Sequence, residues 1–194
     1  MRRRSEPSLT GKPRIPYVAD ADAGPPELVR EIRARRGGVL LNLDRMLLHS
    51  PALAKGWNAH LGAVRGALTI EPKLRELAIC AVAALTGADY EWDQHLPLFI
   101  QAGATDAAAE ALRDVETASA DPVRFDARER AVLHLAIEMT RAVTVSEAAF
   151  EDVRMQLGGD RQVVELVSII ATYNMVSRFL VALGVDAEGE DGAG

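Results

Sequence analysis

The 194-residue chain has a formal net charge of −6, with 48% apolar and 26% charged residues, values that suit one globular domain with its own core. This acidic balance excludes the concentrated basic face that a nucleic acid or an anionic membrane surface would need in a partner. The single cysteine, Cys80, excludes an intrachain disulfide, a CxxC redox pair and a cysteine-rich zinc site, which fits a reducing, cytoplasmic location.

The two ends of the chain differ in composition from its middle. Residues 1–13 are rich in Arg, Pro and Gly and are predicted to form a disordered arm, and residues 187–194 are predicted to form a disordered acidic tail. The ordered domain is therefore expected over residues 14–186. Its longest uninterrupted apolar run is the nine residues 77–85, too short for the roughly 20 residues that span a bilayer, so no membrane partner is expected.

Helical patterns follow one another through this domain, and alternating strand patterns are absent, so we predict an all-α fold with short loops and mostly antiparallel neighbours. Thr105 and Ser146 are predicted N-caps, and Pro97 is expected to kink or restart the helix that contains it. The predicted helical segments are residues 25–38, 39–51, 50–68, 69–87, 88–103, 105–118, 125–143, 146–159 and 160–184.

The segment that begins at Pro72 is apolar on all sides after Glu76, which is typical of a helix at the centre of a domain. A carboxylate on such a helix needs a polar partner if it is buried, and Glu76 is therefore a candidate catalytic residue. Two structural explanations compete with this one. Glu76 would also be stable in an ion pair with an arginine from another helix, or exposed in the first turn, where it favours the helix dipole.

The next segment, GADYEWDQHLPL, places Glu91 and His95 four residues apart, on one helical face. A histidine with a carboxylate beside it is a plausible general acid or base whose tautomer is fixed by its partner. Phe99 continues this face as an apolar wall, while Tyr90 and Trp92 lie on neighbouring stripes. The alternative is a surface histidine that forms an ordinary ion pair with a glutamate one turn away.

Metal and cofactor motifs are absent from the sequence. It contains no HExxH, no Glu-x-x-His pair of the di-iron kind, no GxGxxG, no P-loop and no GxSxG. His49, His60 and His134 each stand alone on a predicted helix and are expected at the surface or at the edge of the core. We therefore predict no metal and no cofactor.

The stretch RELAICAVAALTGADYEWDQHLPLFIQAG resembles the carboxymuconolactone decarboxylase family, which includes the alkylhydroperoxidase D-like proteins. The resemblance implies an alkylhydroperoxidase D-like helical bundle that assembles into homotrimers or homohexamers, with the site near a subunit interface. In the peroxidase branch two cysteines lie seven and four residues before the histidine, and a glutamate lies nineteen before it. This chain has Ala88 and Glu91 at the cysteine positions, but keeps Glu76 and His95.

The resemblance therefore favours the decarboxylase branch over a thiol peroxidase, because a thiol cycle needs a second cysteine. It implies a cofactor-free lyase, decarboxylase or isomerase that removes CO₂ from a small carboxylated lactone or acts on a related carbonyl compound. His95 is the expected proton donor or base, and Glu76 and Glu91 orient it or relay its proton. Peroxidase activity and a non-enzymatic, small-molecule-binding oligomer are the alternatives. The candidate substrate-binding residues are Tyr90, Trp92, Arg75 and Phe99, with Arg65 and Arg45 as further candidates for binding an anion.

The final segment, 160–184, is apolar around too much of its circumference for a surface helix. It is expected either to pass through the core of the monomer or to pack on another subunit, and we predict a trimer or a larger homo-oligomer. Its apolar residues are Val163, Leu166, Val167, Ile169, Ile170, Tyr173, Met175, Val176, Phe179 and Leu180.

Overall fold

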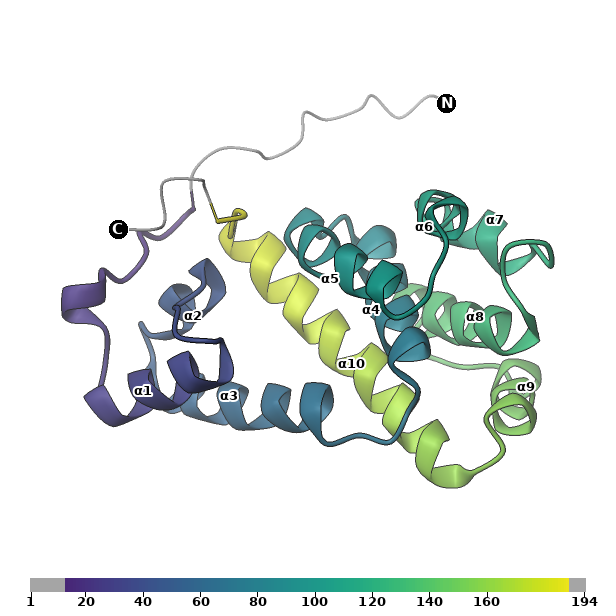
Figure 1. Ribbon diagram of the computed structural model, residues 1–194, viewed down its shortest axis with the longest axis horizontal. Coiled ribbons are helices and arrows are strands. Elements are labelled where there is room, and N and C mark those ends of the chain that lie inside the picture. The colour runs from purple at the N-terminus through teal and green to yellow at the C-terminus, as the bar shows by residue number, and fades with distance from the viewer. Residues whose placement is uncertain (1–12, 189–194) are drawn as a thin grey trace. The chain divides into compact units, whose positions relative to one another are not determined.

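The computed structural model describes residues 13–188, and every regular element in this range is helical, as predicted (Figure 1). Most of the predicted N-terminal arm and the part of the acidic tail beyond Glu188 lie outside the described residues. The elements are the 3-10 turn η1 (Asp20–Asp22) and the helices α1 (Pro26–Arg35), α2 (Asn42–Leu47), α3 (Pro51–Gly66), α4 (Pro72–Thr86), α5 (Asp89–Gln101), α6 (Asp106–Ala111), α7 (Val115–Ser119), α8 (Ala127–Arg141), α9 (Glu147–Leu157) and α10 (Asp160–Leu183).

The chain divides into two compact units, the larger of which is Ala59–Phe179. The smaller unit combines the residues up to Asn58 with those from Leu180 onward. In it, Arg35 and Arg36 approach the buried carboxylate of Asp44 at 3.6 and 3.1 Å. A buried carboxylate is stable only when it is paired in this way, so the pairs hold α1 against α2.

Helix α4 is the centre of the larger unit, as its apolar sequence predicts. It packs against α5 and α8, and α8 also contacts α7 and α9 (Figure 1). Pro72 occupies the first turn of α4, where a missing N–H costs nothing, and Gly87 ends the helix with a left-handed φ of 65°. The residues from Leu77 to Val82 are fully buried, so the middle of α4 is shielded from water on all sides.

Helix α10 is long enough and apolar enough to cross a membrane by length and composition, and it is the only such helix among residues 13–188. Half of its most apolar window is buried inside the protein, which is also typical of a core helix. Within the larger unit, its side chains that are at most 1% exposed are Leu166, Ile169, Ile170, Tyr173, Val176 and Ser177. The prediction that this helix passes through the core is confirmed for these residues.

The predicted helix boundaries differ from the structure in two places. Helix α5 runs without a break through Pro97, because Pro97 and Asp93 lie on the exposed face, where water can hydrogen-bond the carbonyl that the proline leaves unpaired. The predicted segment 105–118 forms two helices instead of one. Asp114 accepts hydrogen bonds from the backbone N–H and the hydroxyl of Thr117 and so begins α7 as a new helix.

Candidate active site

The turn between α4 and α5 brings the predicted catalytic residues together. Only Gly87 and Ala88 separate the two helices, and the N–H of Ala88 donates to the carbonyl of Ala83 at 3.0 Å. So short a connection returns α5 along α4, and the two helices pack closely. Glu76 lies eleven residues before Gly87 and His95 eight after it, and their side chains meet between the helices.

His95 lies between two carboxylates. Its Nδ1 is 2.6 Å from Oε2 of Glu76, and its Nε2 is 3.2 Å from Oε2 of Glu91. The exposed fractions of His95, Glu76 and Glu91 are only 2%, 2% and 4%. The explanation of Glu91 and His95 as an ordinary surface ion pair is therefore wrong, and so is the explanation of Glu76 as an exposed first-turn residue.

The cluster has the electrostatics of an ion pair. Burial alone would lower the pKa of His95, but the hydrogen bonds with Glu76 and Glu91 outweigh it and raise the pKa above the ordinary value of 6.5. Burial alone would raise the pKa of Glu76, but His95 and then Arg75 bring it below the ordinary value of 4.5. Both pKa shifts favour a protonated His95 beside an ionised Glu76. Arg75 supplies a second cation, because its Nε lies 3.0 Å from Oε1 of Glu76.

Tyr173 of α10 completes the cluster. Its hydroxyl is 3.2 Å from Nε2 of His95, and its ring meets the imidazole edge-on, with centroids 5.0 Å apart and planes at 85°. The side chain is 1% exposed. The sequence reasoning included Tyr173 only among the apolar residues of the last helix. A tyrosine on a helix expected in the core is itself an indication of a polar contact, because a buried tyrosine hydroxyl needs a polar partner.

The single cysteine lies one turn along α4 from Glu76. Cys80 is fully buried, and its pKa is raised by burial and by the negative charges of Glu76 and Glu91. The nucleophile in thiol chemistry is the thiolate, and these surroundings keep the thiol protonated. Since the chain has no second cysteine, it has no resolving thiol of its own for a disulfide cycle.

The predicted substrate-binding residues are divided between several environments. Arg75 belongs to the cluster, where its Nη1 also donates to the carbonyl of Arg65 at 3.1 Å. Trp92 is buried beneath the guanidinium of Arg113, whose central carbon lies 4.9 Å from the centre of the indole ring. Tyr90 and Phe99 are buried on α5. Their role in substrate binding stays a prediction.

The other histidines are exposed, as predicted. His49 Nε2 lies 2.8 Å from the carbonyl oxygen of Pro16, and His60 Nε2 lies 2.8 Å from the hydroxyl of Thr172. Among residues 13–188, no group of three or more His, Cys, Asp or Glu side chains is arranged to hold a metal ion.

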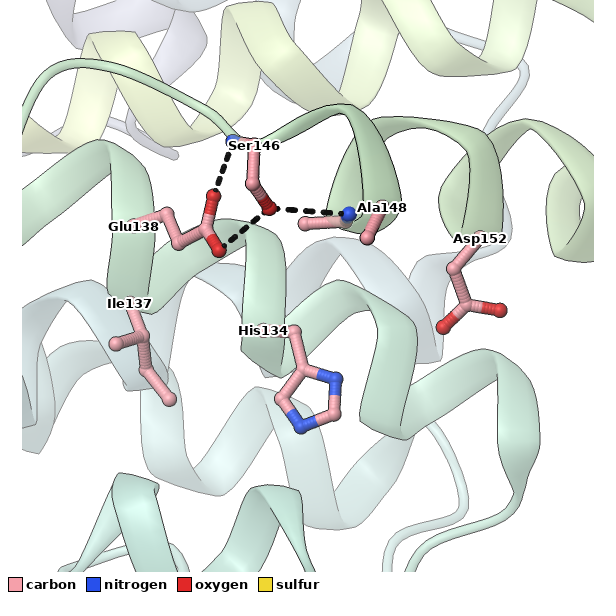
Figure 2. A pocket seen from close by; sticks show the side chains of 7 residues that line it. His134, Ile137, Glu138, Ser146, Ala148 and Asp152 are labelled. Atoms are coloured by element: carbon pink, nitrogen blue, oxygen red, sulfur yellow. Dashed lines mark hydrogen bonds between the residues drawn. The ribbon is translucent and has the colours of Figure 1, made fainter.

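A surface pocket of about 380 Å³ lies elsewhere in the larger unit, beside α8 and α9, with His134, Glu138 and Asp152 in its lining (Figure 2). Figure 2 shows the Glu138 carboxylate held by the N–H and hydroxyl of Ser146, at 2.6 and 2.9 Å. These hydrogen bonds lower the pKa of Glu138 and serve to cap α9. No member of the buried His95 cluster lines this pocket.

Residues 51–138 match the carboxymuconolactone decarboxylase family, the family that the sequence resembles. An uncharacterized peroxidase-related protein from Silicibacter sp. TM1040 has a similar structure, with a TM-score of 0.74 at 21% identity over 95% of this chain and 98% of that one. A peroxidase-related alkylhydroperoxidase AhpD core protein from Ralstonia eutropha JMP134 gives 0.73 at 22% identity, over 92% and 93%.

The debrominase Bmp8 is also similar, with a TM-score of 0.71 at 18% identity over 89% of this chain and 91% of that one. A cysteine-to-alanine variant of that debrominase has been solved in complex with 2,3,4-tribromopyrrole. No curated protein sequence matches the chain. At these identities the structural likeness establishes an alkylhydroperoxidase D-like helical fold and leaves the reaction open.

Proposed function

We propose that this protein is a cofactor-free acid–base enzyme, a carbon–carbon lyase or isomerase that acts on a small carboxylated lactone or a related carbonyl compound. The observation that supports this function is the buried imidazole of His95, which has a carboxylate at each ring nitrogen. Its partners fix the ring and favour the protonated form, so His95 is suited to deliver a proton to a bound substrate.

The two ring nitrogens of His95 have different tasks in this proposal. The contact between Nδ1 and Glu76, at 2.6 Å, is short for a charge-assisted hydrogen bond and anchors the ring. The contacts of Nε2 with Glu91 and Tyr173, both 3.2 Å, exceed the usual range of about 2.7–2.9 Å for such bonds. The Nε2 proton is the more weakly held of the two, and it is the proton that a substrate would take.

In the lyase form of the reaction, the bond between the substrate carbon and its carboxylate breaks, and the electron pair moves into the adjacent unsaturated carbonyl system. CO₂ leaves, and a carbon of the resulting enolate takes the proton from Nε2. His95 is left neutral, still hydrogen-bonded to Glu76, and regains a proton from solvent. In the isomerase form, Nε2 would give its proton to one carbon of the substrate, and the neutral imidazole would then take a proton from another carbon, without loss of CO₂.

A carboxylated substrate also requires a cation near the acid. Arg75 uses Nε for Glu76 and Nη1 for the carbonyl of Arg65, so its first role is to hold Glu76 ionised. Arg65 lies close enough for its charge to lower the pKa of His95, and within residues 13–188 no carboxylate forms an ion pair with its guanidinium. Arg45 is paired with Asp20. We therefore propose Arg65 as the group that binds the substrate carboxylate.

Thiol peroxidase chemistry, by contrast, has little support in these residues. The position that carries a cysteine in that branch is occupied here by Glu91, whose carboxylate contacts His95, and Cys80 is buried with a raised pKa. The remaining alternative is a helical protein that binds a small molecule without turnover. The buried ion pair alone does not distinguish it from an enzyme, because buried ion pairs also occur as structural elements.

Deuterium incorporation separates these functions. The wild-type protein and the variants His95→Gln and Cys80→Ser would be incubated in D₂O with a panel of β-keto acids and carboxylated lactones, and the rate of carbon deuteration followed by NMR. We expect His95→Gln to lose about 10²- to 10⁴-fold in rate and Cys80→Ser to match the wild type. Equal rates in wild type and His95→Gln would overturn the proposal, and binding without deuteration would favour the non-enzymatic protein.

We also propose that the working form is a homo-oligomer, a trimer or hexamer. Helix α10 supports this, because its outer face within the larger unit carries exposed Val164 and Met175, at 64% and 41%, with Ala171 and Ser168 between them at helical spacing. Ser168 directs its hydroxyl to the carbonyl of Val164 in its own helix, which leaves this stripe weakly polar.

A further inference from the structure

The two arginines beside the His95 cluster are joined by a short connection between α3 and α4. Arg65 lies in the last turn of α3 and Arg75 in the first turn of α4, and residues 67–71 connect the two helices. The Nη1 of Arg75 donates to the carbonyl of Arg65 at 3.1 Å, while its Nε contacts Glu76. The geometry of this connection therefore controls the position of the end of α3, and with it of Arg65, relative to the cluster.

Helix α10 holds this connection through the carboxylate of Glu165. One oxygen, Oε2, accepts hydrogen bonds from the N–H of Thr69 at 2.7 Å, from the hydroxyl of Thr69 at 3.0 Å and from the N–H of Ile70 at 2.9 Å. The other oxygen, Oε1, lies 2.9 Å from Nε of Arg161. Hydrogen bonds to an ionised acceptor are roughly twice as strong as neutral ones, so Glu165 attaches the connection firmly to α10.

Burial makes this attachment difficult to replace. Ile70 is only 3% exposed and Glu165 only 7%. A buried backbone N–H needs an acceptor within the protein, so without the carboxylate the N–H of Ile70 would have to turn toward water, and the connection would shift. The buried side chain of Ile70 would still anchor the segment in the core. The expected effect of losing the carboxylate is therefore a displacement of the connection instead of its unfolding.

The same helix also contacts the proposed acid. Tyr173 lies eight residues after Glu165 on α10, about 12 Å along the helix axis, and its hydroxyl is 3.2 Å from Nε2 of His95. Helix α10 thus fixes the connection that follows α3 and the imidazole in one rigid frame. A substrate that binds Arg65 through its carboxylate and takes a proton from His95 needs the distance between these two groups to be correct.

We propose that Glu165 is a positioning residue that places Arg65 at the correct distance from His95 to bind the substrate carboxylate. Glu165 does not touch the substrate and acts through its hydrogen bonds with Thr69 and Ile70. The inference rests on the proposed function, in which Arg65 binds that carboxylate, and deepens it by naming the group that sets the carboxylate affinity. Arg65 meets the carboxylate before the carbon–carbon bond breaks, so its displacement weakens substrate binding and leaves the proton transfer in place.

Benzoate provides a test that needs no knowledge of the natural substrate, because it presents a carboxylate and does not lose CO₂ under assay conditions. Its dissociation constant would be measured by calorimetry for the wild type, Arg65→Gln, Glu165→Ala, Glu165→Gln and Glu138→Ala. Glu138→Ala is the matched control, because Glu138 holds the N–H and the hydroxyl of Ser146 in the same manner, at 2.6 and 2.9 Å, between α8 and α9. Circular dichroism would verify that each variant folds.

We expect Arg65→Gln to weaken benzoate binding by about 10- to 100-fold and Glu165→Ala by about 10-fold, with no change in Glu138→Ala. Glu165→Gln should stay within about threefold of the wild type. Its amide oxygen can still accept the N–H groups, and it loses only a pair with Arg161, whose side chain is 67% exposed. In the deuteration assay, Glu165→Ala should raise KM by about 10-fold and change kcat by less than about threefold.

Wild-type affinity in Glu165→Ala, together with a loss in Arg65→Gln, would overturn this inference and leave the proposed function intact. Equal weakening in Glu165→Ala and Glu138→Ala would also overturn it, because a general structural effect would then explain both. If Glu165→Ala does not fold, Thr69→Ala decides instead. It removes one of the three donors and should weaken binding by about threefold, and an unchanged affinity would overturn the inference. Benzoate affinity that does not depend on Arg65 would overturn both the role of Arg65 and this inference.

Discussion

The ion pair between Glu76 and His95 should give the free energy of unfolding a characteristic dependence on pH, and Glu76→Gln is the variant that exposes it. The substitution keeps the size of the side chain but removes the charge that faces Nδ1 at 2.6 Å. It leaves His95 buried with a weaker partner, so the pKa of His95 should fall from its raised value.

The expected cost follows from the burial of the pair. Removing one partner of a buried ion pair typically costs about 3–5 kcal/mol, because the other charge stays buried without compensation. His95 can escape part of that cost by releasing its proton. The cost then approaches the roughly 1.5–3 kcal/mol of a lost hydrogen bond to a charged group.

The sign of the pH dependence is set by the two pKa shifts. Glu76 has a lowered pKa when folded, so its contribution to stability is present above about 4.5 and is lost as the pH falls through the folded value. His95 has a raised pKa when folded, so its contribution is complete below about 6.5 and is lost as the pH rises through the folded value. The cost of Glu76→Gln should therefore be largest between these two values and should decline at alkaline pH.

Urea unfolding at a series of pH values measures this directly. At pH 5.5 we expect Glu76→Gln to lose about 3 kcal/mol or more, with the loss smaller by at least about 1 kcal/mol at pH 9. Glu165→Gln is the matched control. Glu165 is a buried carboxylate that accepts hydrogen bonds from the N–H groups of Thr69 and Ile70 and pairs with Arg161, so its partners here are two backbone groups and an arginine instead of a histidine. A cost of Glu76→Gln that is as independent of pH as that of Glu165→Gln would refute the ion pair.

Three further predictions follow from the same cluster and from α10. Glu91→Gln should destabilise the protein less than Glu76→Gln in the same urea assay, because the Glu91 carboxylate is 3.2 Å from Nε2 of His95 and makes the weaker of the two contacts. An equal or larger loss of stability would contradict the assignment of Nδ1 as the nitrogen that anchors the ring. Cys80 should resist a thiol reagent such as Ellman's reagent in the folded protein and react only after unfolding, since it is buried with a raised pKa; rapid labelling of the native protein would reopen thiol chemistry. Met175→Glu should shift the protein toward a smaller species in light scattering, and a monomeric wild type at micromolar concentration would contradict the proposed oligomer.

Most of the fold, and every residue of the candidate site except Tyr173, could be predicted from the sequence. The carboxylate at Glu76, on a helix otherwise apolar on every side, and the four-residue spacing of Glu91 and His95 were both local signals. A two-residue turn limits how α4 and α5 can be arranged, so local patterns were enough to indicate a contact between residues nineteen apart.

Tyr173 could not be found in the same way. It lies 78 residues from His95, on a helix whose buried face carries many apolar side chains, and nothing in the sequence indicates which of them reaches the imidazole. Long-range contacts depend on how helices pack, which periodicity alone does not fix. The sequence pattern does not show the break between α6 and α7, because Asp114 lies inside a continuous helical pattern and yet acts as the N-cap of a new helix.

The proposed acid–base function depends above all on the protonation state of His95. In protein labelled with ¹⁵N, NMR of the histidine rings at neutral pH reports whether one or both nitrogens carry hydrogen, and His95→Gln assigns the signals among the four histidines. We predict that both Nδ1 and Nε2 of His95 are protonated, and that Glu76→Gln removes one of these protons at the same pH. A neutral ring with a single N–H in the wild-type protein would contradict the proposal that His95 is held ready as an acid.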